Sequence, residues 1–285
     1  MSPGDRARAY PPASGQSLAL AGVLAGARVF SNCPIPALPQ SGYHDRDVEI
    51  VFIPQTGAAA KHSQNTEVAP PCGIALPPAT GLRGQIAEDG RWAAIEEYPD
   101  QLQDRALSVR RVLPFAVALQ GEVTLHAAAV SGASAVHAFV GASGAGKSTL
   151  AASLAGLGMQ TLADDLLPCR MRDGAVAVPI DQNQSFLPLR AVYFLARRGD
   201  AEYVSRTQLS SADCLKRLLV HGFGEVGLKK AWAVQFALYE CIARTIPAYD
   251  LLVPDCLPHL QDSARAVKAL IARQASQATS FQTDT

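Results

Sequence analysis

One glycine-rich segment constrains the fold of this 285-residue chain more than any other feature. Residues 141–148 read GASGAGKS and match the pattern G-x-x-x-x-G-K-[ST]. An apolar run at 135–140, typical of a buried strand, precedes the segment, and a predicted helix at about 147–157 follows it. Strand, glycine loop and helix in this order predict an α/β domain, in which helices cover a β-sheet.

The residue types of this segment suit a polyphosphate ligand. Glycines allow a turn whose backbone N–H groups point inward, and the N-terminus of the following helix adds a positive dipole end. The Lys147 ammonium would meet the β- and γ-phosphates, and the Ser148 hydroxyl would bind the Mg²⁺ that bridges them. The alternative is a turn without a ligand, in which Gly144 and Gly146 would only weaken the helix start. The predicted ATP site comprises Gly141, Ala142, Ser143, Gly144, Ala145, Gly146, Lys147, Ser148 and Thr149.

Two adjacent carboxylates and a histidine are further candidates for chemistry. Asp164 and Asp165 follow a predicted strand at 160–163, where one carboxylate can hold a metal while the other accepts a proton from a hydroxyl. An ordinary surface turn is the alternative for this pair. A lone histidine such as His126 is more often a core residue, but pairing of its strand with 135–140 would bring it to the glycine loop. The other histidines, including His221, show no ligand spacing and are interpreted as structural or exposed.

Composition excludes several classes of protein. Lys and Arg number 25 and Asp and Glu also number 25, so the zero net charge does not favour a nucleic-acid partner. The 6 cysteines form no C-x-x-C pair, which favours reduced thiols and a reducing compartment over a metal cage or disulfides. The apolar stretch at 18–27 is too short to cross a membrane. A secretory signal is its alternative, but glycines interrupt it and strand-like sequence follows, so we predict a cytoplasmic protein.

Five segments are predicted along the chain. They are a flexible leader at 1–16, a small β-rich module at 17–98, a connecting helix at 99–120, an α/β domain at 121–273 and a disordered tail at 274–285. Asp173 and Gly174, between two apolar runs, predict a hairpin, so the sheet of the α/β domain is expected to be mixed.

The chain resembles the HPr kinase/phosphorylase family, specifically its HPr kinase-like relatives. The likeness rests on LHAAAV around His126, on GASGAGKST at 141–149 and on LADD at 162–165. It implies that the α/β domain is a P-loop kinase core with a mixed sheet, similar to the C-terminal domain of that family, and that the small β module precedes it.

The same resemblance implies roles for individual residues. Asp164 would be the general base for a serine hydroxyl, Ser148 and Asp165 would hold Mg²⁺, and His126 would line the phosphate site. The sequence departs from the family at 181–185, where DQNQS replaces a glycine-rich signature. HPr itself is therefore not the expected acceptor, and the reverse phosphorylase reaction is not expected either.

The wider group resembled here includes kinases that phosphorylate a serine of lasso-peptide precursors. We therefore predict a Mg-ATP-dependent kinase that acts on a serine of a peptide or small protein, with no membrane or nucleic-acid partner; the resemblance also allows a homo-oligomer. Lys147, Asp164 and His126 are the expected catalytic residues. His126 or an arginine would stabilise the transferring charge, and the candidate arginines are Arg190, Arg206 and Arg217. The alternative for each is a solvated surface charge, since arginine is usually exposed.

Two other functions remain open at the level of sequence. The first is a small-molecule kinase that acts on an amino acid or a sugar alcohol, which a closed polar pocket beside Asp164 would favour. The second is a nucleotide-gated binding module that signals by conformation. The presence of both Asp164 and Asp165 favours chemistry, because binding alone needs no proton acceptor.

Overall fold

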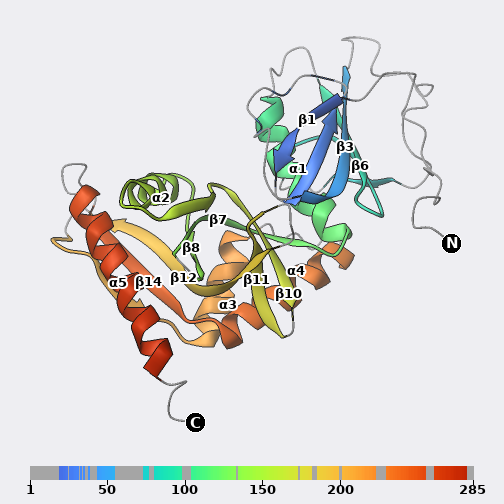
Figure 1. Cartoon of the computed structure of the whole chain (residues 1–285). Coiled ribbons are helices and arrows are strands. Elements are labelled where there is room, and N and C mark those ends of the chain that lie inside the picture. The colour runs from blue at the N-terminus through green and yellow to red at the C-terminus, as the bar shows by residue number, and fades with distance from the viewer. Residues whose placement is uncertain are drawn as a thin grey trace. The chain divides into compact units, whose positions relative to one another are not determined.

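The computed structural model separates into two compact units, Met1–Gly121 and Glu122–Thr285, and each has its own sheet (Figure 1). The structure describes residues 19–24, 26–31, 33, 35, 38, 44–54, 73–76, 80–97, 104–132, 134–172, 174–181, 185–198, 201–222, 229–254 and 260–280. The predicted leader at 1–16 lies outside these residues.

The first unit combines a six-stranded sheet with the helix α1 (Arg105–Leu119). Its strands are β1 (Ala19–Leu24), β2 (Gly26–Ser31), β3 (His44–Pro54), β4 (Gly73–Ala75), β5 (Gly84–Ala87) and β6 (Trp92–Glu97). They lie in the order β1-β2-β3-β6-β5-β4, and β3 is parallel to both β2 and β6. The helix packs on β3 and β6, so the helix expected to connect two domains belongs to the β-rich unit.

Capping and close packing hold α1 in place. The Asp104 carboxylate accepts hydrogen bonds from the backbone N–H groups of Ala106 and Leu107, which satisfies two donors at the helix start. The turn between β5 and β6 lies directly against the helix at Gly90, where a Cβ atom would overlap the Ala116 carbonyl oxygen. Gly90 also has a φ of 71°, so only glycine suits both the backbone and the contact.

The second unit is a layered α/β domain. Its strands are β7 (Val123–Ser131), β8 (Val136–Val140), β9 (Gln160–Ala163), β10 (Leu166–Arg172), β11 (Ala175–Pro179), β12 (Phe186–Arg198), β13 (Ser205–Gln208) and β14 (Ala248–Pro254). Its helices are α2 (Lys147–Gly156), α3 (Ser211–His221), α4 (Lys229–Thr245) and α5 (Leu260–Ser280). None of the helices that the structure describes combines the length and the apolar character needed to cross a membrane.

The sheet of the second unit is mixed, as predicted. The strand order is β11-β10-β7-β8-β12-β14-β13, and β9 pairs with β7 beside β10. The long strand β12 is parallel to both β8 and β14, while its first residues pair antiparallel with β11. The expected hairpin is the antiparallel pair β10–β11. Because β12 also pairs with β11, the strand at one end of this order, the sheet curls back on itself.

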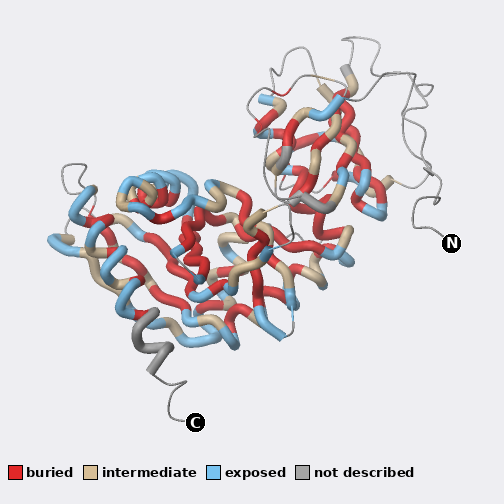
Figure 2. The backbone as a smooth tube through the Cα atoms, in the orientation of Figure 1, coloured by how far each residue is buried: buried red, intermediate tan, exposed pale blue. Residues whose placement is uncertain are grey.

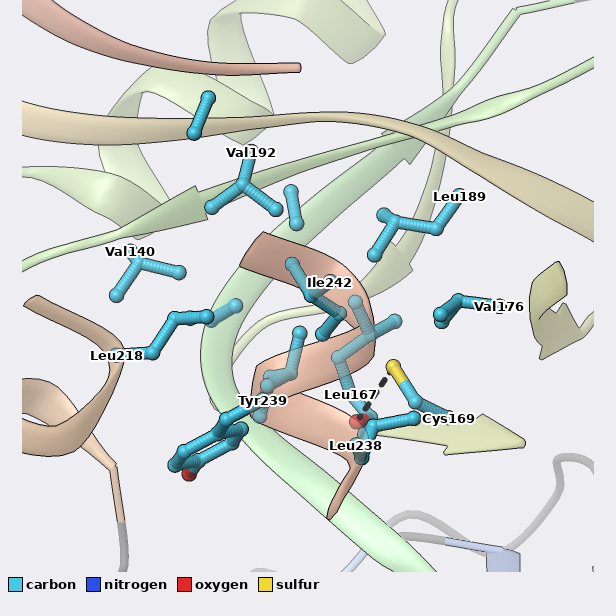
Figure 3. Close-up of a cluster of buried hydrophobic side chains, with 14 of the residues drawn as sticks. Val140, Leu167, Cys169, Val176, Leu189, Val192, Leu218, Leu238, Tyr239 and Ile242 are labelled. Atoms are coloured by element: carbon cyan, nitrogen blue, oxygen red, sulfur yellow. Dashed lines mark hydrogen bonds between the residues drawn. The ribbon is translucent and has the colours of Figure 1, made fainter. Parts of the chain in front are cut away.

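Helices cover both faces of this sheet. Val136, Ala138 and Val140 of β8 belong to a buried cluster with residues of α3 and α4, whereas Phe139 packs with residues of α2 and α5. This alternation is the period of two expected of a strand. Figure 3 shows the first cluster, in which Leu218 of α3 lies near Val140. Figure 2 shows that the strands are largely buried, whereas the outer faces of the helices are exposed.

The predicted disordered tail at 274–285 is wrong over its first part, because α5 continues to Ser280. Gln274 is buried rather than exposed: it accepts a hydrogen bond from the Tyr193 hydroxyl at 2.7 Å and donates one to the Tyr249 hydroxyl at 3.0 Å. Gln274 continues the buried face of the helix because both of its hydrogen-bond partners are buried. Its polar character in the sequence does not indicate this burial. Residues 281–285 lie outside the described part of the chain.

Two short edge strands, β13 and β4, carry no strand pattern in the sequence. β13 reads SRTQ and is polar throughout, because it lies at the edge of the sheet and pairs with β14 only. β4 has 3 residues and lies at the edge of the first sheet. Edge strands need no buried apolar face, so they leave no alternating pattern in the sequence.

We predict that His137 makes the second unit sensitive to acid. It is buried on β8, with its ring centroid 6.2 Å from that of Tyr193, and its Nδ1 has no hydrogen-bond partner among the described residues. Burial, together with a smaller effect from the charge of Arg190, lowers the pKa of His137 from 6.5 to about 4. Between these two pKa values the unfolded chain binds a proton that the folded chain excludes, so stability is full above pH 6.5 and falls as the pH falls.

The drop in stability is large enough to measure. About 1.4 kcal/mol per pH unit gives a loss of about 2 kcal/mol between pH 6.5 and about pH 5. Urea unfolding at both pH values measures it. His137→Phe keeps an aromatic ring beside Tyr193 and should remove most of the loss, and an equal loss in both proteins would rule out His137 as its source.

Candidate functional site

The glycine loop, residues 141–146, joins the buried end of β8 to the start of α2, as predicted. Gly144 and Gly146 have φ values of 80° and 87°, in the left-handed region that side chains avoid. The Ala145 N–H donates to the Ala142 carbonyl at 3.1 Å, and the Leu150 N–H donates to the Gly146 carbonyl at 2.9 Å as the helix begins. The loop is therefore a tight turn that ends at a helix N-terminus.

The loop lies against the end of β12. A Cβ atom on Gly141 would be 2.8 Å from the Leu195 carbonyl oxygen, and one on Gly146 would overlap the guanidinium of Arg197. The parallel pairing of β12 with β8 places Phe194 opposite Val140, so the residues that follow these two lie at the same end of the sheet. This end, formed by the carboxyl ends of parallel strands, is where α/β proteins bind ligands.

Lys147 places its ammonium group inside the loop. Its Nζ donates to the carbonyl of Gly141 at 2.8 Å and to that of Ala142 at 3.1 Å, and the residue is only 7% exposed. Burial lowers the pKa of Lys147, and the charges of Asp165 and Asp164 oppose that effect. A cation is thus held at the loop with two carboxylates within electrostatic reach.

The first turn of α2 presents hydrogen-bond donors to solvent. The first N–H groups of a helix have no carbonyl partner within it, and the capping residue here is Gly146, which has no side chain to bond them. Ser148 and Thr149 are exposed on this turn. Unpaired N–H groups, two hydroxyls and the Lys147 ammonium fit the polyphosphate of a nucleotide.

Asp164 and Asp165 lie one strand away from the end of β8. β9 and β10 run along the same edge of β7, with Ala163 opposite Ala129 and Leu166 opposite His126. The two aspartates connect β9 to β10, and the Ala127 N–H donates to the Asp165 carbonyl at 3.0 Å.

The pairing of β7 with β8 aligns Ala127 with Val140, the residue before the loop. His126 and the acidic pair therefore reach the same end of the sheet as the loop. The His126 Nε2 lies 3.1 Å from the Asp165 Oδ1, and their side chains are 28% and 34% exposed. His126 is thus a half-buried residue at the sheet end and not a core histidine, and strand pairing brings it there as expected.

Sequence reasoning missed His221, at the end of α3. Its ring centroid lies 6.3 Å from that of Phe194, the residue that pairs with Val140. Burial lowers the pKa of His221, and the charges of Lys147, His126 and Arg217 lower it further, so it lies within electrostatic reach of two predicted catalytic residues. A lone histidine near a helix end carries no spacing signal that could have revealed this.

The three candidate arginines have different surroundings in the second unit, and among them the charge of Arg217 acts on His221. Arg190 is exposed, two residues before the part of β12 that pairs with β14, and its charge acts on His137. Arg206 stacks on the ring of Tyr249, with its Cζ 4.8 Å from the ring centroid. Arg217 donates to the Asp250 carboxylate at 2.7 Å. Arg197, which is not among the three candidates, packs on the loop at Gly146.

A magnesium site here would draw on few protein ligands. Among the described residues, no three His, Cys, Asp or Glu side chains gather as they would in a metal cage. Mg²⁺ usually keeps several waters and binds one or two carboxylates together with phosphate oxygens. The exposed Ser148 hydroxyl and the partly exposed Asp165 carboxylate are ligands of the right chemistry for such a site.

No protein family and no curated protein matches this sequence. Among solved structures, the chain is similar to the Hpr(Ser) kinase/phosphatase from Coxiella burnetii. That match covers 53% of this chain and 98% of the other, at 11% sequence identity and a TM-score of 0.30. The similarity is distant and carries no conclusion about activity.

Proposed function

We propose that this chain is a Mg-ATP-dependent kinase that transfers the γ-phosphoryl group to a hydroxyl group. The observation that carries the proposal is the gathering of an ammonium, two carboxylates and an imidazole around a glycine loop at a helix start. Phosphoryl transfer depends on positioning and on neutralising charge, and these groups supply both.

Each residue has a role in this scheme. Lys147 and the N–H groups of the loop and of α2 hold the β- and γ-phosphates. Ser148 and Asp165 hold Mg²⁺, which neutralises charge on the phosphates when bound. Asp164 accepts the proton of the acceptor hydroxyl. The oxygen of that hydroxyl forms a bond to the γ-phosphorus while the bond from the γ-phosphorus to the ADP oxygen breaks. The products are a phosphate ester and ADP.

The acceptor in this proposal is a serine of a peptide or small protein. Asp164 is exposed and Asp165 is partly exposed, so a side chain carried by a larger molecule can reach the carboxylates. The resemblance to kinases of peptide precursors supports the same acceptor. A small-molecule acceptor is the second candidate, and it would need parts of the chain to enclose Asp164.

Intact-mass analysis tests the proposal. The full chain is incubated with Mg-ATP and a panel of serine-containing peptides, free serine and small polyols. A gain of about 80 Da on a peptide, the mass of one phosphoryl group, supports the proposed acceptor. The same gain on serine or a polyol supports the second candidate. ADP release without any phosphorylated product, or no turnover, contradicts the kinase assignment.

A further inference from the structure

Arg197 lies against the glycine loop at the start of α2. A Cβ atom on Gly146 would overlap the Nε and Nη2 of Arg197 and lie 2.5 Å from its Cζ, so the guanidinium packs on the Gly146 Cα. Gly146 is the residue that caps α2. Arg197 is half-buried near the end of β12, and its position follows from the pairing of β12 with β8.

This placement gathers positive charge at one point. The N-terminus of α2 carries the positive end of the helix dipole, which disfavours cations nearby. Lys147 already holds an ammonium group inside the loop. A guanidinium added to these two is favourable when an anion with several charges lies among them. The arrangement therefore suits the phosphate chain of a nucleotide better than a singly charged ligand.

Arginine suits this position better than lysine. The guanidinium is planar, so it can pack flat on the Cα of Gly146 and still direct N–H groups from its edge. It carries five N–H donors, enough to contact the protein and two phosphate oxygens together. An ammonium at the same place would keep the charge but lose both the flat contact and the fork of donors.

Resting on the proposed function, we infer that Arg197 binds the phosphate chain of ATP from the β12 side of the loop and complements Lys147. Arg197 is then a ligand-binding residue that β12, the strand parallel to β8, supplies through tertiary packing. Its contribution grows with the number of phosphates on the nucleotide, because each added phosphate adds charge near the guanidinium.

Calorimetric titration of the full chain with Mg-ATP, Mg-ADP and AMP tests this inference. We expect Arg197→Gln to weaken ATP binding about 10- to 100-fold, which is the range for a lost charge-assisted hydrogen bond, and to weaken AMP binding less. Arg197→Lys should recover part of that loss. Arg172→Gln is the matched control: it removes a guanidinium packed 4.3 Å from the ring centroid of Phe186 on the same sheet, and should bind as the wild type does.

The outcomes separate this inference from the proposed function. A wild-type chain that binds no nucleotide contradicts both. Wild-type binding of ATP with an unchanged Arg197→Gln affinity overturns the role of Arg197 alone. An equal loss for ATP, ADP and AMP also overturns it, because a distorted loop and not a lost phosphate contact would then explain the effect. Thermal unfolding of each variant shows whether it has folded.

Discussion

Replacing Lys147 by alanine should abolish phosphoryl transfer in a chain that still folds. The Nζ of Lys147 is held by two carbonyls of the loop. Without it, the charge that develops on the transferring phosphoryl group loses one of the groups that neutralise it, and we expect transfer to fall at least about 1,000-fold. Single-turnover transfer from Mg-ATP measures the change.

Stability should change little in the same variant. Burial of Lys147 disfavours its charged form, and this cost offsets the two hydrogen bonds that its Nζ makes. Lys268→Ala is the matched control, because its ammonium donates to the Leu157 carbonyl at the other end of α2. It should leave transfer unchanged. Transfer that survives in Lys147→Ala would remove the loop from the proposed mechanism.

Local sequence patterns predicted the parts of the site that neighbouring residues build. The order of β8, glycine loop and α2 follows from one motif, in which φ values above zero need glycine and the helix begins at Lys147. The acidic pair after β9 was predicted in the same way, from its place at the end of a strand. These features depend on backbone conformation within a few residues, and sequence carries that information directly.

Packing between distant segments determined what the sequence did not reveal. Arg197 reaches the loop because β12 lies parallel to β8, and His221 comes within electrostatic reach of Lys147 because α3 packs on the sheet, with the His221 ring beside Phe194. Gln274 continues α5 because two tyrosines on other strands bond its side chain. None of these residues carries a spacing pattern, since each acts through a partner far away in the chain.

His126 is an intermediate case. Its role depended on a strand pairing that the sequence suggested without specifying the register. The observed register, with Leu166 opposite His126 and Ala127 opposite Val140, brings it within 3.1 Å of Asp165. A shift by one residue would have pointed the imidazole to the other face of the sheet.

The two aspartates should respond differently to the loss of charge. The Oδ1 of Asp165 lies 3.1 Å from the His126 Nε2, and this contact orients the carboxylate. Asp164 is exposed and can meet an incoming hydroxyl. We therefore expect Asp164→Asn to keep Mg-ATP binding and to lose transfer about 100- to 10,000-fold, since an amide cannot accept the proton.

Asp165→Asn should show the opposite pattern, with binding of ATP that no longer strengthens when Mg²⁺ is added. Titration of ATP with and without Mg²⁺, followed by single-turnover transfer for each variant, separates the two roles. An amide is nearly the same size as a carboxylate, so the contact with His126 and the strand register need not change. The opposite result would be that Mg²⁺ no longer strengthens ATP binding in Asp164→Asn, while Asp165→Asn loses only transfer. The roles of the two residues are then exchanged, and the aspartate in contact with His126 is the proton acceptor.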